Sequence, residues 1–335
     1  MANYTEERIN DFLNGRAFLW VMIALLALCS WLGMATGRFA ATDSGGGIFF
    51  KIDLAEALGH SALLSWTINL ALLLLTTWLS LLLNKVFTPI RAVTRLFASM
   101  FLLLMLALPP VSVQLGVGTL MLAVAVGLMF VLFASYDQRG YSQSRIYIIF
   151  ALLTTCCLFH YSFLALMVAF ALGFFQMHSM GFRGTVAMLL GIATPFWIGF
   201  GLGLLDPTMA MAPMLGLQWP LTMNAGTQFL IVALAGVAVL AVVLIVVNSF
   251  TFRNYRREIR VYNYFIATLG IVALVAMAAD VSHALTYVPL LCWSLSIQLA
   301  HTFTINSSFL HRHVFILLIV AAALALWFMQ LLWAV

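Results

Sequence analysis

The feature that most limits the fold is an uncharged, apolar run of 32 residues, 146–177, which lies between arginine-bearing turns. A hydrocarbon core about 30 Å thick is crossed by about 20 helical residues, so the run is too long for one transmembrane helix and short for two. Arg139 and Arg145 precede it and Arg183 follows it. Because Lys and Arg collect in cytoplasmic loops, both ends are expected on one side of the membrane. The sequence therefore predicts a hairpin of two short helices, with residues 159–162 as its tip near the outer surface.

Composition places the whole chain in a membrane. Of its 335 residues, 64% are hydrophobic and 7% are charged, which excludes a soluble globular domain. The four cysteines all fall within apolar runs, without the spacing of a disulfide framework or a zinc site. The formal net charge of +5 comes from basic residues in short loops, so topology explains it and nucleic acid is not expected as a partner.

Apolar segments separated by polar turns predict an all-α polytopic transmembrane bundle of about 11 spans, in a single domain covering residues 1–335. The expected spans are residues 17–36, 62–83, 96–108, 115–134, the two helices of the 146–177 hairpin, 185–205, 226–250, 264–279, 285–303 and 314–335. Residues 1–16 are expected in the cytoplasm, and residues 37–60 and 206–224 form outer loops. A cleaved signal peptide is the alternative for the first span, but the acidic residues before it do not fit the basic start of such a peptide.

The distribution of basic residues favours the same topology. With the amino terminus in the cytoplasm and the carboxyl terminus in the periplasm of a bacterial inner membrane, 13 of the 15 Lys and Arg residues lie inside. Only Arg38 and Lys51 lie outside. The densest basic group is expected to set the topology and to touch anionic lipid headgroups. This group is Arg253, Arg256, Arg257 and Arg260.

The first outer loop contains the clearest polar pattern. At about 100° per residue, Asp53, Glu56 and His60 fall on one side of a helix, and Leu54 and Leu58 fall on the other. The sequence therefore predicts an amphipathic interfacial helix near residues 50–60 that lies on the outer leaflet.

The candidate catalytic residues are Asp53, Glu56, His60 and His160, all expected at the outer face. Carboxylates and imidazoles serve as general acids and bases, or hold a divalent cation beside a phosphate. The alternative for the first three is the solvated side of an interfacial helix, and for His160 a buried ring satisfied by a neighbouring carbonyl. Asp280 and His283 either form a ligand pair or mark a span boundary with a helix cap. No cofactor motif is evident, so a divalent cation is the only cofactor that the residues suggest.

Two stretches flank the hairpin: LLNK before FTP within residues 82–89, and FR followed by LGIATPF within residues 182–196. Together with the hairpin they resemble an uncharacterised integral-membrane family of Bacteroidota-type bacteria. The resemblance covers roughly residues 60–210. It implies a membrane and an envelope but no assigned reaction.

The hairpin sequence LFHYSFL, residues 158–164, is similar to a short membrane hairpin in O-antigen and exopolysaccharide polymerases and related lipid-linked sugar transferases. That hairpin reads roughly L-x-x-x-F-H-x-S-A-L. The resemblance implies an outward-facing glycosyl-transfer site with acids in the outer loops. The chain differs from those proteins in having no arginine-rich outer loop to bind a pyrophosphate.

Three functions therefore stay open. The first is a non-catalytic component of cell-envelope biogenesis that packs against other inner-membrane proteins. The second is a lipid-linked glycan polymerase or glycosyltransferase of polysaccharide biosynthesis, with the four candidate catalytic residues at its outer site. The third is a transporter, for which only Asp280, at a helix end, offers an intramembrane acid. Membrane lipids are expected partners in all three, with a lipid-linked substrate or other inner-membrane proteins in addition.

Cysteine labelling from the periplasm checks the predicted orientation. A cysteine introduced at Thr208, in the 206–224 outer loop, should react with a membrane-impermeant maleimide in intact cells. A cysteine introduced at Asn254, among the clustered arginines, should react only after the membrane is permeabilised. The opposite pattern would invert the whole topology.

Overall fold

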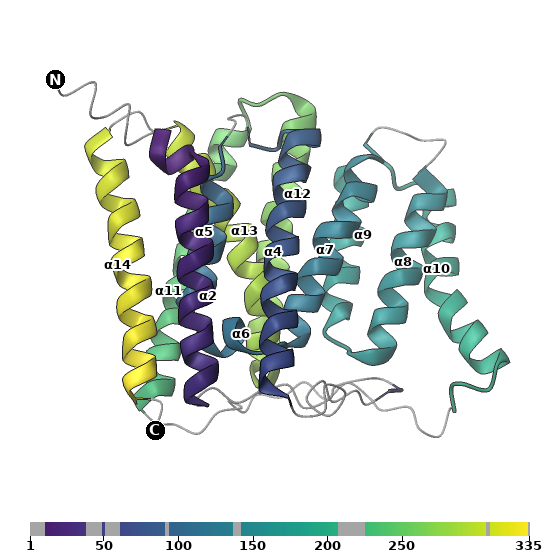
Figure 1. The fold of residues 1–335 in the computed structure, drawn as a ribbon. Helices are drawn as coiled ribbons and strands as arrows, with labels where there is room; N and C mark the ends of the chain where they lie inside the picture. Colours follow the sequence, from purple (N-terminus) through teal and green to yellow (C-terminus); the bar gives the residue numbers. More distant parts are fainter. Residues whose placement is uncertain are drawn as a thin grey trace.

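The computed structural model describes residues 11–37, 49–50, 61–90, 94–136, 142–206, 225–305 and 309–333. Within these ranges the regular structure is entirely helical, and the helices form a bundle in which successive long helices along the chain run in opposite directions (Figure 1). This confirms the predicted all-α membrane bundle. Asp53, Glu56 and His60, which the predicted interfacial helix contains, lie outside the described residues.

Each predicted span corresponds to one helix, and the central hairpin is made of two. The helices are α2 (Arg16–Thr36), α4 (Ala62–Phe87), α5 (Leu96–Leu106), α7 (Val117–Phe133), α8 (Ser142–Phe159), α9 (Phe163–Gln176), α10 (Phe182–Gly201), α11 (Ala225–Phe252), α12 (Arg257–Ala279), α13 (Ala284–Ile305) and α14 (Phe309–Trp333). Two short helices, α6 (Pro109–Val113) and the 3-10 helix η2 (Val281–His283), lie in turns. Among the described residues, six helices are long and apolar enough to cross a membrane, namely α2, α4, α10, α11, α12 and the Phe315–Trp333 part of α14.

Helix α5 is too short to cross a bilayer alone, because its 11 residues rise only about 17 Å. All of its residues are buried by other helices, so its length need not match the lipid. The sequence indicated that Pro109 and Pro110 end this span. They also occupy the first positions of α6, where the N–H that proline lacks would have had no helical partner.

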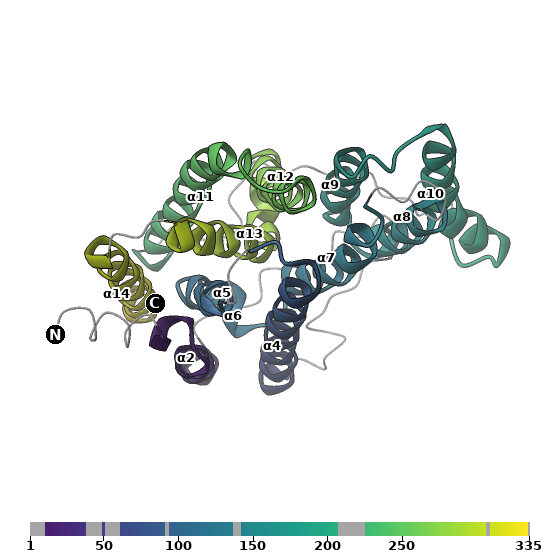
Figure 2. The ribbon, with the colours of Figure 1, turned by 90° about the horizontal axis from the view of Figure 1, so that it is seen from above.

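The helix at the centre of the bundle is α13, which packs against α5, α7, α11 and α12. Seen along the helices, it lies between the α11 and α12 side and the α5 and α7 side (Figure 2). Every residue from 284 to 301 is buried. This helix is therefore enclosed by protein, and its polar side chains have to find partners within the bundle.

Side chains along α13 bond to three different neighbouring helices. Trp293 Nε1 donates to Ser80 Oγ of α4 at 2.7 Å, and Ser294 Oγ donates to the Ile266 carbonyl of α12 at 2.8 Å. On α11, Asn248 Nδ2 donates to the Gln298 side chain at 2.9 Å. These bonds fix the rotation of α13 relative to each partner.

All described Lys and Arg residues lie at one end of the bundle, here called the basic end, which is at the top of Figure 1. Hydrogen bonds connect separate segments at the basic end. Thr94 Oγ1, just before α5, donates to Asn14 Oδ1, just before α2, at 2.7 Å. Ser179 Oγ, after α9, donates to the Ser135 carbonyl after α7 at 2.8 Å. The residues concerned are Arg16, Lys85, Arg95, Arg145, Arg183, Arg253, Arg256, Arg257, Arg260 and Arg312.

At the opposite end, hydrogen bonds between uncharged groups join α4 to α2 and α6. Trp66 Nε1, near the start of α4, donates to Ser30 Oγ of α2 at 2.9 Å. Asn69 Nδ2 donates to the Val111 and Ser112 carbonyls, which lie in the last turn of α6, at 3.1 and 3.0 Å. These bonds satisfy carbonyls that the short helix cannot satisfy itself.

The predicted hairpin is the pair α8 and α9, joined by a turn at residues 160–162. Helix α8 also packs closely on α10, where a Cβ added at Gly191 would lie 2.7 Å from the Tyr147 carbonyl oxygen. On the other side, α9 packs on α12. The hairpin thus links the peripheral helix α10 to the central part of the bundle (Figure 2).

Glycines of α7 offer a test of the packing around α13. We expect Gly118→Ala to destabilise the protein by about 1 to 3 kcal/mol, because its methyl group would collide with the Thr286 carbonyl oxygen and the Pro289 ring of α13. Gly127→Ala, on the same helix, meets open space and should be neutral or stabilising by up to about 1 kcal/mol. Thermal unfolding of the purified variants in detergent measures both. Equal stability of the two variants would contradict the close approach of α7 and α13.

Candidate functional site

The tip of the hairpin holds His160 in a defined position. Its backbone N–H continues the hydrogen bonding of α8 by donating to the Cys156 carbonyl at 3.0 Å. Its ring Nδ1 accepts a hydrogen bond from the Ser162 backbone N–H at 3.2 Å, at the point where α9 begins. The imidazole is 3% exposed. His160 therefore turns the chain and places its ring inside the end of the bundle.

The turn between α12 and α13 lies beside this tip. Asp280 ends α12, with its backbone N–H donating to the Ala276 carbonyl at 2.9 Å, and its side chain is 1% exposed. Ser282 Oγ donates to Asp280 Oδ1 at 2.8 Å. Asp280 is thus both the boundary of a span, as the sequence indicated, and a buried acceptor.

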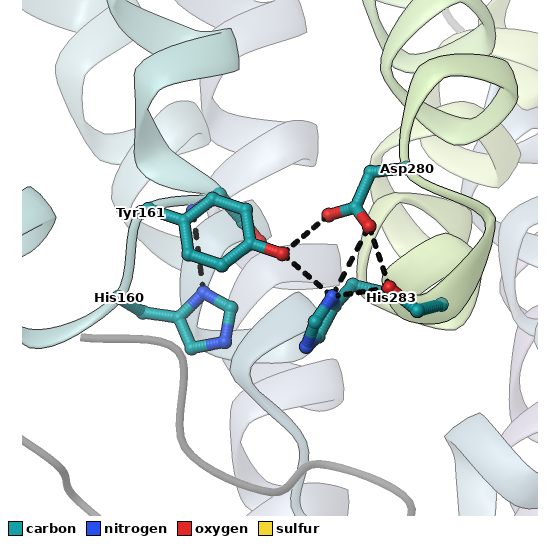
Figure 3. Close-up of polar contacts among 6 residues, drawn as sticks. His160, Tyr161, Asp280 and His283 are labelled. Atoms are coloured by element: carbon teal, nitrogen blue, oxygen red, sulfur yellow. Dashed lines mark hydrogen bonds and ion pairs between the residues drawn. The ribbon is translucent and has the colours of Figure 1, made fainter. Parts of the chain in front are cut away.

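Tyr161 joins the two turns (Figure 3). Its hydroxyl lies 2.6 Å from Asp280 Oδ2 and 2.6 Å from His283 Nδ1. His283 Nδ1 also lies 3.2 Å from Asp280 Oδ1. We call the group of His160, Tyr161, Asp280, Ser282 and His283 the Tyr161 cluster.

The environment of Asp280 keeps its carboxylate ionised. Burial raises the pKa of this group, but hydrogen bonds from Tyr161, Ser282 and His283 lower it by more, so the net pKa lies below its ordinary value. An ionised carboxylate only accepts hydrogen bonds. The Tyr161 hydroxyl therefore donates to Asp280, and its oxygen is left to accept from His283.

These bonds assign opposite tautomers to the two histidines. His283 Nδ1 carries a proton, which points at Tyr161 and Asp280, so its Nε2 holds a lone pair. His160 Nδ1 accepts from a backbone N–H, so its Nε2 carries the proton. The ring centroids are 5.8 Å apart, and both Nε2 atoms point to the same side of the cluster (Figure 3). One ring thus carries an N–H hydrogen-bond donor and the other a lone pair that can act as a general base.

Metal binding fits this arrangement less well. Within the part of the chain that the structure describes, no group of three His, Cys, Asp or Glu side chains is placed to hold a metal ion. In its assigned tautomer, His160 also has no ring lone pair free for a cation. The divalent cation suggested by the sequence stays a prediction.

Of the four predicted catalytic residues, the structure places His160 in the cluster. Asp53, Glu56 and His60 lie outside the described residues, so their roles stay predictions. The described residues just before them contact the hairpin tip, because the Phe50 N–H donates to the Leu158 carbonyl at 3.2 Å and its ring stacks on Phe159.

The basic group predicted for topology and lipid headgroups, Arg253 with Arg256, Arg257 and Arg260, lies at the basic end and is remote from the cluster. Arg253 lies over the Phe250 ring at 5.3 Å. It takes no part in the site.

Sequence reasoning missed Tyr161 and Ser282 as site residues. A signal was present, because the parity of the predicted spans puts the hairpin tip and the turn after residue 279 at the same face of the membrane. Polar residues in two turns of one face are candidates for mutual contact. The number of membrane crossings does not determine which turns at that face are neighbours.

Comparisons with protein-family models, with curated proteins and with solved structures found no match to this chain. The chemistry of the Tyr161 cluster therefore carries the functional argument.

Removing the Tyr161 hydroxyl tests the hydrogen-bond network. We expect Tyr161→Phe to lower the free energy of unfolding by about 1 to 3 kcal/mol, because Asp280 and His283 lose a shared partner in a buried site. Thermal unfolding in detergent at neutral pH measures the loss. Tyr264→Phe is the control, since the structure gives its hydroxyl no hydrogen bond to a described residue. Equal unfolding temperatures for the two variants would contradict the network.

The lowered pKa of Asp280 predicts a pH dependence. A carboxylate with a folded-state pKa below its ordinary value of 3.8 contributes stability above that pH, and the contribution is lost as the pH falls through the folded-state pKa. The stability difference between wild type and Asp280→Asn should therefore be constant from neutral pH to about pH 5 and shrink below about pH 4. Unfolding curves over this range measure it, and a difference independent of pH would contradict ionisation of Asp280.

Proposed function

We propose that this integral membrane protein is an inner-membrane component of cell-envelope biogenesis that works as a lipid-linked glycan polymerase or glycosyltransferase. In this proposal the basic end faces the cytoplasm and the Tyr161 cluster faces the periplasm. The segregation of every described Lys and Arg at the basic end supports the orientation, because basic loops are retained in the cytoplasm.

The observation that carries the catalytic part is the pair of opposite tautomers at His160 and His283. Glycosyl transfer from a lipid-linked donor breaks the bond between the anomeric carbon and a phosphate oxygen and forms one to an acceptor hydroxyl. His283 Nε2 would take the proton of that hydroxyl. His160 Nε2–H would donate a hydrogen bond to the leaving phosphate.

Asp280 and Tyr161 act on this chemistry through His283. A carboxylate bonded to the far nitrogen of an imidazole holds it in one tautomer and stabilises the imidazolium that forms when the ring takes a proton. Tyr161 and Asp280 together hold His283 Nδ1 in this way. The cluster lies among helix ends, the level at which a lipid-linked sugar presents its phosphate.

A non-catalytic role is the second candidate, and one observation favours it. The Tyr161 bonds connect the hairpin to the turn between α12 and α13, and polar bonds between helices stabilise membrane bundles. In this case the cluster holds the hairpin in place for packing against other inner-membrane proteins.

Asparagine substitutions separate the two roles. In His283→Asn the side-chain amide can replace the Nδ1–H donor, and in His160→Asn the amide oxygen can replace the Nδ1 acceptor, but both variants lose Nε2. We expect each variant to fold and to give surface polysaccharide as short or as sparse as the full deletion, because loss of an acid or base costs about 100-fold or more in rate. Electrophoresis of envelope glycans from cells with matched protein levels measures this.

Tyr264→Phe serves again as the control and should restore wild-type glycan. Wild-type glycan in both asparagine variants, together with a clear defect in the deletion, would refute catalysis and leave the non-catalytic role. A deletion that leaves every envelope glycan unchanged would refute both.

A further inference from the structure

A second site lies at the basic end, far from the Tyr161 cluster and independent of the proposed function. A cavity of about 690 Å³ opens between the start of α8, the end of α9 and the start of α10. Its polar lining comes from Gln143, His178, Ser179 and Arg183. None of the described residues that line it is a carboxylate.

The lining suits an anion with several acceptor oxygens. Arg183 carries a permanent charge and five N–H donors in a planar fork, which matches the oxygens of a phosphate. Gln143 and His178 can add uncharged donors. The Ser179 hydroxyl is already bonded to the Ser135 carbonyl at 2.8 Å, so it shapes the wall and does not supply a donor.

The backbone conformation of His178 is one that favours glycine, so the presence of an imidazole there indicates a role for the side chain. His178 has a φ of 55°, in the left-handed region, and it closes α9 with bonds from the His178 N–H to the Phe175 carbonyl and from the Ser179 N–H to the Phe174 carbonyl, each 3.1 Å. Glycine is the usual residue at this position of a helix end, because a Cβ is unfavourable there. An imidazole at this position brings a donor into the cavity that glycine would not.

The rim of the cavity is apolar. Phe175 is 67% exposed and Phe182 is 87% exposed, and both line the cavity. Exposed aromatic rings beside an arginine at the end of a membrane bundle suit an amphiphile whose charged head meets the arginine and whose chains meet the rings.

We propose that this cavity binds a phosphate-bearing anion, with Arg183, His178 and Gln143 on the phosphate oxygens. The aromatic rim favours the headgroup of an anionic phospholipid as the source. A soluble phosphate has the same oxygen chemistry but gains nothing from Phe175 and Phe182.

Titration of the purified protein in detergent tests the proposal. The probes are short-chain phosphatidylglycerol, inorganic phosphate and, as the zwitterionic comparison, short-chain phosphatidylcholine, with binding followed by calorimetry. We expect Arg183→Gln to weaken phosphatidylglycerol binding by about tenfold or more, because the substitution removes a pair of charge-assisted hydrogen bonds to the phosphate. Arg16→Gln removes the same charge at the same end outside the cavity and should bind as the wild type does.

His178→Gly is the second variant, because it relieves the left-handed backbone and removes only the ring. It should weaken binding while leaving the unfolding temperature unchanged or higher. If Arg183→Gln does not fold, Arg183→Lys keeps the charge without the fork and should bind with intermediate affinity.

The outcomes separate the two sources. Tighter binding of phosphatidylglycerol than of inorganic phosphate assigns the site to a lipid headgroup, and the reverse assigns it to a soluble phosphate. Equal losses in the Arg183 and Arg16 variants, unchanged binding in His178→Gly, or no binding of either phosphate probe by the wild type would overturn the proposal.

Discussion

The rest of the bundle depends on the enclosure of α13, a helix that carries polar side chains yet meets neither water nor lipid along residues 284–301. An unbonded polar group in such a place costs several kcal/mol by order of magnitude, whereas one bond between membrane helices contributes only about 0.6 to 2 kcal/mol. The penalty for a wrong partner is thus larger than the gain from a right one. Pairs such as Trp293 with Ser80 and Gln298 with Asn248 therefore define which neighbours α13 accepts and in what rotation.

The Tyr161 cluster inherits its geometry from this enclosure. Because α13 is fixed, the turn that carries Asp280 and His283 is fixed as well. The hairpin is positioned beside that turn because α9 packs on α12. At this contact a Cβ added at Gly173 would lie 2.5 Å from the Phe265 ring. Only a glycine lets the two helices approach so closely. Packing between α9 and α12 thus brings the two turns together, with the Tyr161 hydroxyl 2.6 Å from Asp280 Oδ2.

The fold was largely predictable from the sequence, and the site only in part. An uncharged run between arginines is sufficient to predict a hairpin, because both of its ends must lie on one side of the membrane. The turn between α8 and α9 falls at residues 160–162, which lie within the predicted tip. Hydropathy did not show that α13 is central, since a buried polar helix and a weak span have similar composition. The link from Tyr161 to Asp280 joins residues 119 positions apart, and it depends on which helices are neighbours. Spacing along the chain carries no information of that kind.

The pairing of an N–H donor on His160 with a lone pair on His283 Nε2 exists only while Asp280 is ionised. With a carboxylate at Asp280, Tyr161 donates to it and the proton of His283 stays on Nδ1, which leaves the lone pair on Nε2. A protonated Asp280 could donate to Tyr161, and the phenol would then donate to His283 Nδ1, which moves the ring proton to Nε2. Both histidines would then present N–H groups on the same side, and the acceptor would be gone. The buried carboxylate, which contacts neither Nε2 atom, thus determines whether His283 Nε2 holds a lone pair beside the N–H group of His160.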